Sequence, residues 1–102
     1  GFECQVNNTY HDPKKTASIY GVVDCLEAPA NDDEWFDLYI KVEGKKVITK
    51  VNGKVISEWT QPADWKKGSS FERILGEGTF ALQGHDPGST VLFRNLFVKR
   101  LP

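Results

Sequence analysis

The sequence predicts an all-β protein with the architecture of an antiparallel β-sandwich or jelly roll. Apolar and polar side chains alternate with a period of two in several short segments, which is typical of half-buried strands. Clusters of Gly, Pro, Asn, Asp and Ser separate these segments and indicate turns. No long segment has the apolar spacing of an amphipathic helix. We expect about seven short strands, which is few for a complete two-sheet sandwich.

The middle of the chain has the clearest strand pattern. Residues 36–42 alternate between apolar and polar side chains, and the tetrad at 43–46 predicts a turn. Residues 47–51 then reach Asn52-Gly53, a strong hairpin signal because both residues tolerate positive φ. Residues 54–59 are the predicted return strand. A strict period of two assigns the side chains of this hairpin to two faces, with Val47, Val51 and Ile56 on one and Ile48, Val55 and Trp59 on the other.

Further strands are predicted near both ends of the chain. Residues 2–6 alternate, residues 79–83 form a short apolar segment, and residues 91–100 are largely apolar on both faces. A strand with two apolar faces is typical of a central position, so we expect 91–100 to be central. Between them, residues 61–70 predict a loop with a helical turn at 62–67.

Length and charge exclude several classes of function. A chain of 102 residues predicts one domain over 1–102. Its 13 Lys and Arg balance 14 Asp and Glu, so we expect neither nucleic acid nor an anionic membrane as a partner. No apolar run approaches the ~20 residues of a membrane span. The chain begins in a predicted strand without an initiator Met, so we expect sequence upstream of Gly1.

Three polar groups are candidate site residues. Glu3, Gln5 and Asn7 form a polar row on one face of the opening strand, as in a sugar-binding sheet, or an ordinary solvent face. The segment 83–86 carries a His and a carboxylate away from a strand end. That His is a general base or metal ligand, or simply a solvated loop residue. The polar pair Arg94-Asn95 interrupts the apolar pattern of the last strand. Arg94 either binds an oxyanion or forms a structural ion pair with a core carboxylate.

Other chemical signals are weaker. Cys4 and Cys25 lie far apart in the sequence, which predicts buried thiols or a disulfide rather than a zinc site. The acidic run at 32–34 offers oxygens to Ca²⁺ but lacks the spacing of a known calcium loop. Asn7-Asn8-Thr9 matches the N-glycosylation sequon.

Several segments together resemble the 3-keto-disaccharide hydrolase domain family. The matching segments are 1–6, 17–21, 34–44, 51–53, 81–86 and 91–98. The resemblance covers nearly all of this chain and about the C-terminal half of the family's domain. It implies a concanavalin-like or laminin-G-like β-sandwich, and export to the periplasm or medium of a bacterium.

The resemblance also implies cleavage of a glycosidic bond beside a 3-keto sugar. A C3 ketone acidifies the C2 proton, a base removes it, and the C1 substituent leaves by β-elimination. On this basis His85 or Glu3 is the base, and Arg94 with a divalent metal, if one binds, stabilises the enolate. The residues expected to orient sugar hydroxyls are Gln5, Asn7, Tyr20, Gln83 and Asn95.

Two other interpretations stay open at this point. In the first interpretation, the chain is a non-catalytic carbohydrate-binding module, since the same fold serves many functions. Alternatively it is an inactive fragment of a larger domain, in which case an uncovered apolar sheet face favours a homodimer.

Overall fold

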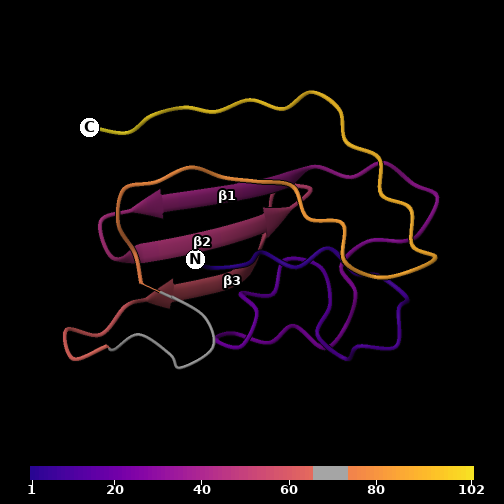
Figure 1. The fold of residues 1–102 in the computed structure, drawn as a ribbon, viewed down its shortest axis with the longest axis horizontal. Coiled ribbons are helices and arrows are strands. Elements are labelled where there is room, and N and C mark those ends of the chain that lie inside the picture. Colours follow the sequence, from indigo (N-terminus) through magenta and orange to yellow (C-terminus); the bar gives the residue numbers. More distant parts are fainter. Residues whose placement is uncertain (66–73) are drawn as a thin grey trace.

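In the part of the chain that the structure describes, the protein is all-β, and its regular structure is one antiparallel sheet of three strands. The computed structural model describes residues 1–65 and 74–102, and these residues contain no helix. The strands are β1 (Leu38–Glu43), β2 (Lys46–Val51) and β3 (Lys54–Thr60), in the order β1-β2-β3 (Figure 1). The all-β class is therefore confirmed, and a second sheet that would complete a sandwich stays a prediction.

Two tight turns produce this sheet. The β1–β2 turn places Gly44 at a φ of 58°, where a residue without Cβ is favoured. The β2–β3 turn holds Asn52 and Gly53 at φ values of 49° and 81°, the double positive φ of a type I′ hairpin. Asn52 also ties the turn to the residue before β1, because its Oδ1 accepts a hydrogen bond from the Asp37 N–H at 2.9 Å. Both predicted hairpin turns are confirmed.

A β-bulge changes which side chains share a face in β3. The register pairs Thr49 with Ser57 but Lys50 with Val55, so Ile56 is an extra residue without a partner in β2. The extra residue reverses the alternation that follows it. Trp59 therefore pairs with Val47 on the buried face, and the prediction that it shares a face with Ile48 is wrong. A period of two cannot anticipate an inserted residue.

The opening segment pairs with residues 16–20 rather than with the sheet. Cys4 forms an antiparallel bridge with Ile19, and the Tyr20 N–H donates to the Glu3 carbonyl at 3.0 Å. Ala17 sits at a φ of 70°, so the pairing is too irregular for a continuous strand. The continuous strand predicted for 2–6 is therefore wrong, because the structure has only an isolated bridge there, at Cys4.

The core lies between this bridged segment and the inner face of the sheet. Its buried apolar residues are Ala17, Ile19, Val47 and Val51, and its buried polar residues are Asn7, Thr16, Ser18, Thr49 and Ser57. Every buried side-chain nitrogen and oxygen among the described residues has a hydrogen-bond partner. The core is therefore small, and hydrogen bonds join its two layers as well as apolar contact.

The Ala17 carbonyl makes the main polar link between the layers. It accepts hydrogen bonds from Thr49 Oγ1 and from Ser57 Oγ, both at 2.8 Å. Thr49 Oγ1 also accepts from the Ser57 N–H at 3.1 Å, across the β-bulge. The Thr49 hydroxyl therefore forms one hydrogen bond within the sheet and one to the bridged segment that packs on it.

We expect Thr49→Val to lower the free energy of unfolding by about 1–3 kcal/mol, because it leaves the buried Ser57 N–H without its acceptor. Valine keeps the shape and the strand propensity, so the loss reports hydrogen bonding. Urea unfolding followed by tryptophan fluorescence measures it. The matched control is Thr60→Val at the exposed end of β3, where a change within about 0.5 kcal/mol is expected. Equal losses at the two positions would contradict this role.

The C-terminal part departs from the prediction. Residues 79–83 and 91–100 form no strand, and Asn95 has a φ of 54° within the second segment. Figure 1 shows the chain after residue 74 passing along the β1 side of the sheet and returning as an outer yellow segment. Leu92 and Phe97 are 71% and 89% exposed. The predicted central position of 91–100 is therefore wrong, because no described strand lies beside it to pair its backbone or cover its two faces.

The loop prediction for 61–70 is confirmed for the part that the structure describes. Residues 61–65 are irregular, and the Trp65 N–H donates to the Pro62 carbonyl at 3.1 Å. The remainder of that loop and the end of the proposed helical turn at 62–67 lie outside the described residues. Among the residues searched, 1–65 and 74–102, no helix has the length and apolarity to cross a membrane.

Candidate functional site

His85 and Asp86 form a hydrogen-bonded pair at the start of a tight turn. The Pro87-Gly88 dipeptide follows, Gly88 has a φ of 80°, and the Ser89 N–H donates to the Asp86 carbonyl at 3.2 Å. Pro at the second position and a positive-φ Gly at the third are the signature of a type II turn. His85 Nδ1 lies 3.0 Å from Asp86 Oδ1, with the imidazole 76% exposed and the carboxylate 32% exposed. The imidazole is therefore accessible while its partner is held.

Glu3 lies close enough to act on this pair electrostatically. The hydrogen bond and charge of Asp86 raise the pKa of His85 above its usual value, and the negative charge of Glu3 raises it further. Glu3 is positioned by its carbonyl, which accepts the Tyr20 N–H. The charge of an acid in the opening segment thus acts on an imidazole near the other end of the chain.

The other members of the opening polar row are engaged in an internal network. Asn7 is buried, its Nδ2 donates to the carbonyls of Asp12 and Lys14 at 3.0 Å each, and its Oδ1 accepts from the Tyr10 N–H. Gln5 Nε2 also points to the Lys14 carbonyl, at 3.4 Å. These amides organise the loop at 8–15. The same bonds enclose the amide nitrogen at which the Asn7 sequon would be glycosylated.

Tyr20 is joined to the same loop by its hydroxyl, which donates to Asp12 Oδ2 at 3.0 Å. Lys14 Nζ lies 4.3 Å from the centroid of the Tyr20 ring. The pKa of Asp12 is lowered, chiefly because its carboxylate accepts the Lys14 backbone N–H and also the Tyr20 hydroxyl. Lys15 Nζ adds bonds to the carbonyls of Tyr10 and Asp12 at 2.7 and 2.8 Å. Tyr20 therefore borders an ordered, charged loop.

The guanidinium of Arg94 contacts an aromatic ring. Its guanidinium carbon lies 4.0 Å from the centroid of Trp35, a cation–π geometry. Asn95 and Gln83 are both exposed. The structure thus pairs His85 with Asp86 in the field of the Glu3 charge, places Arg94 over Trp35, and leaves Gln83 and Asn95 on the surface.

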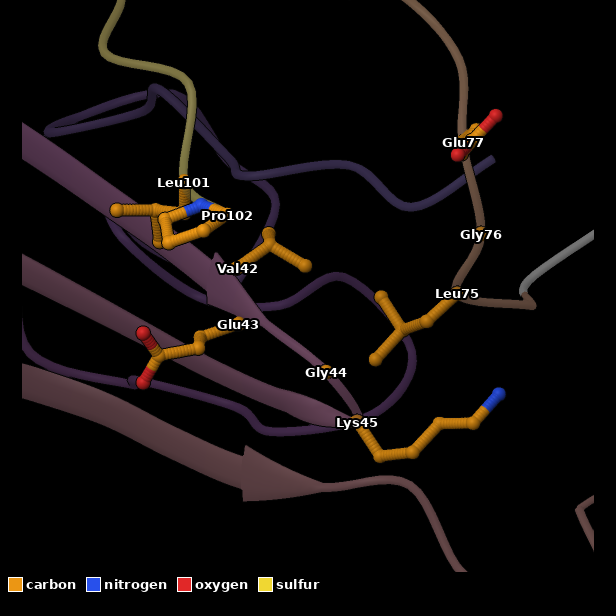
Figure 2. A pocket seen from close by; sticks show the side chains of 9 residues that line it. All are labelled: Val42, Glu43, Gly44, Lys45, Leu75, Gly76, Glu77, Leu101 and Pro102. Carbon is orange, nitrogen blue, oxygen red and sulfur yellow. The ribbon is translucent and has the colours of Figure 1, made fainter.

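A surface depression lies away from these residues. It has a volume of about 420 Å³ and is formed by the β1–β2 turn, residues 75–77 and the C-terminal Leu101 and Pro102 (Figure 2). Figure 2 shows the carboxylates of Glu43 and Glu77 on opposite sides of it. Neither Glu3 nor His85 lines the depression, so it is not the centre of the candidate chemistry.

The cysteines and acidic residues do not assemble a metal site in the described chain. Both thiols are free, and burial raises the pKa of Cys4 to about 12, with a further contribution from Glu3. Asp32, in the acidic run, accepts a hydrogen bond from the Thr9 hydroxyl. No three His, Cys, Asp or Glu side chains within 1–65 and 74–102 are grouped to hold a metal ion. The donor set within these residues does not fit a metal centre.

Two partners of the site were not singled out as site residues from the sequence. These partners are Asp86, which bonds to His85, and Trp35, which lies under Arg94. The Asp-Pro-Gly-Ser run at 86–89 indicates a type II turn, which holds the backbone of its first residue, Asp86. No sequence signal pairs Trp35 with Arg94, which are distant in the chain.

A family model for the 3-keto-alpha-glucoside-1,2-lyase-like domain matches residues 1–99. The chain belongs to this family. The family match confirms the resemblance stated from the sequence and supports a carbohydrate-related role for this lyase-like domain. No curated protein and no solved structure matches the chain.

The match spans the segments that carry the candidate chemistry. Both Glu3 and His85, and also Arg94, fall within the matched residues of the lyase-like domain. The match extends over the exposed C-terminal segment as well as the sheet. The carbohydrate-related role therefore applies to the chain as a whole rather than to the sheet alone.

Proposed function

We propose that this chain cleaves 3-keto-glucosides by removing the C2 proton and expelling the C1 substituent. The observation that carries the proposal is the accessible imidazole of His85, hydrogen-bonded to Asp86 and within the field of Glu3, in a lyase-like domain. An imidazole titrates near neutral pH and serves as a general base. Of the two candidate bases, His85 has the orienting partner.

The reaction balances with side chains alone. Neutral His85 takes the C2 proton, and the electrons of the C2–H bond form a C2=C3 double bond while the ketone oxygen becomes an enolate. The enolate then re-forms the ketone, and the new C1=C2 double bond expels the C1 oxygen. The imidazolium returns its proton to that leaving oxygen, which regenerates the base.

A positive charge near the enolate oxygen lowers the barrier to proton removal. We assign this role to the guanidinium of Arg94. The Trp35 ring beneath its guanidinium, at 4.0 Å, restricts where that charge can lie. Glu3 supports the imidazolium that forms on His85, since its negative charge favours the protonated state.

The test is exchange of the C2 proton of methyl 3-keto-α-glucoside into D₂O, followed by NMR together with methanol release. We expect the protein to accelerate both processes over the protein-free rate. Calorimetry measures binding of the same compound in parallel. Binding without exchange would make the chain a carbohydrate-binding module, and neither binding nor exchange would support the inactive-fragment interpretation.

A further inference from the structure

The turn that follows His85 holds the backbone of Asp86. Pro87 restricts its own φ, and Gly88 supplies the φ of 80° that the type II turn requires. The Ser89 N–H closes the turn on the Asp86 carbonyl at 3.2 Å. The backbone of Asp86 is therefore held on its C-terminal side, and the 3.0 Å contact of its Oδ1 with His85 Nδ1 places its side chain beside the preceding residue.

The atom that Asp86 contacts decides which ring nitrogen of His85 carries the proton. A carboxylate is only an acceptor, so the 3.0 Å contact requires an N–H on Nδ1. In a neutral imidazole one nitrogen is then the donor and the other an acceptor. Nε2 is left with its lone pair, on a side chain that is 76% exposed.

We propose that Asp86 is a positioning residue, which holds neutral His85 as the Nδ1–H tautomer so that Nε2 is the proton acceptor. This inference rests on the proposed function, and it extends that function by assigning the reacting nitrogen and the residue that selects it. Asp86 does not touch the substrate in this account. It acts through the imidazole, as the carboxylate of a catalytic triad does.

Two negative groups act on His85, and they have different roles. Asp86 lies on the same loop and bonds directly to Nδ1, whereas Glu3 comes from the opening segment and acts through its charge. Only the direct bond can select a tautomer. Both groups raise the pKa of His85, so the removal of either is expected to lower it, but the loss of Asp86 alone should alter the tautomer.

The experiment compares the wild-type chain with Asp86→Asn by ¹⁵N–¹H NMR of the His85 ring over a pH titration. Asparagine suits the first position of this turn, so the backbone is expected to be unchanged. We expect wild-type His85 to show Nδ1–H above its pKa, and the variant to shift toward Nε2–H and to titrate at lower pH. Activity on methyl 3-keto-α-glucoside should fall at least about tenfold at a pH where both are neutral.

Asp24→Asn is the matched control, because it removes an exposed carboxylate on another segment. It should leave the tautomer, the pKa of His85 and the activity unchanged. Nε2–H in the wild type, or an Asp86→Asn spectrum identical to wild type, overturns the inference. The spectrum does not depend on turnover, so a chain with the Nδ1–H tautomer and no lyase activity refutes the proposed function while the positioning by Asp86 stands.

Discussion

His85→Gln is expected to lower kcat/KM for a 3-keto-glucoside by about 10²–10⁴-fold, which is the usual contribution of a general base. Glutamine has a similar reach and can still donate a hydrogen bond to Asp86, but its amide does not accept a proton at neutral pH. The imidazole is exposed, so little change in folding stability should accompany the loss. Initial rates of methanol release from methyl 3-keto-α-glucoside measure the effect.

The second histidine of the chain provides a matched control. His11 is also exposed, and its ring contacts Tyr10 at a centroid distance of 4.1 Å. His11→Gln should therefore keep wild-type kcat/KM. A large loss with Glu3→Gln and none with His85→Gln would make Glu3 the base and contradict the assignment.

The pH dependence of the same reaction follows from the charges around His85. The base must be neutral, and Asp86 and then Glu3 raise the pKa of His85 above its usual value. Activity should therefore rise with pH through this raised pKa and be lost below it, where the imidazole is already protonated. In Glu3→Gln the rise should move to lower pH, because one of the two charges that favour the imidazolium is gone. A profile without this displacement would show that Glu3 does not act on the base.

Ile19→Ala is expected to lower the free energy of unfolding by about 2–5 kcal/mol, as for other fully buried aliphatic residues. Ile19 is 2% exposed, and its backbone bridges both Cys4 and Val23. Truncation leaves a cavity at the centre of a small core, where few neighbours are available to fill it. Thermal unfolding should show a decrease of several degrees for each kcal/mol in a chain of this size.

Leu92→Ala is the control for this loss, since Leu92 is 71% exposed and its truncation should change stability by less than about 0.5 kcal/mol. A larger loss at Leu92 than at Ile19 would show that the C-terminal segment is covered in solution, as the expected homodimer requires. Ile19→Ala should also disturb the site. The next residue, Tyr20, donates the backbone hydrogen bond that positions Glu3.

Local chemistry explains why the central sheet was predictable. The alternation at 36–42 and the two turns at 44–45 and 52–53 depend on side-chain period and on φ preferences, and β1, β2 and β3 begin and end within two residues of the predicted limits. The β-bulge at Ile56 was not predictable. The bulge accompanies hydrogen bonds from Ser57 to Thr49 and to the Ala17 carbonyl. The alternation of apolar and polar residues along the sequence carries no information about these contacts.

The candidate site was predictable as a set of residue types but not as an arrangement. A His beside a carboxylate at 85–86, and an acid at position 3, were visible in the sequence. The effect of the Glu3 charge on His85 and the stacking of Arg94 on Trp35 both join segments that are distant in the chain. The enclosure of Asn7 by backbone carbonyls requires the chain to fold back as a loop. Such contacts depend on where whole segments pack.

The sequence by itself determined the all-β class, the two hairpin turns and the chemistry available at His85, because each depends on a few neighbouring residues. Only the tertiary structure decided that 91–100 lies outside the sheet, that Trp59 turns inward and that the charge of Glu3 acts on His85. The physical reason is that strand pairing and burial are properties of two segments at once. An alternating segment is a strand only when a neighbour is there to accept its hydrogen bonds.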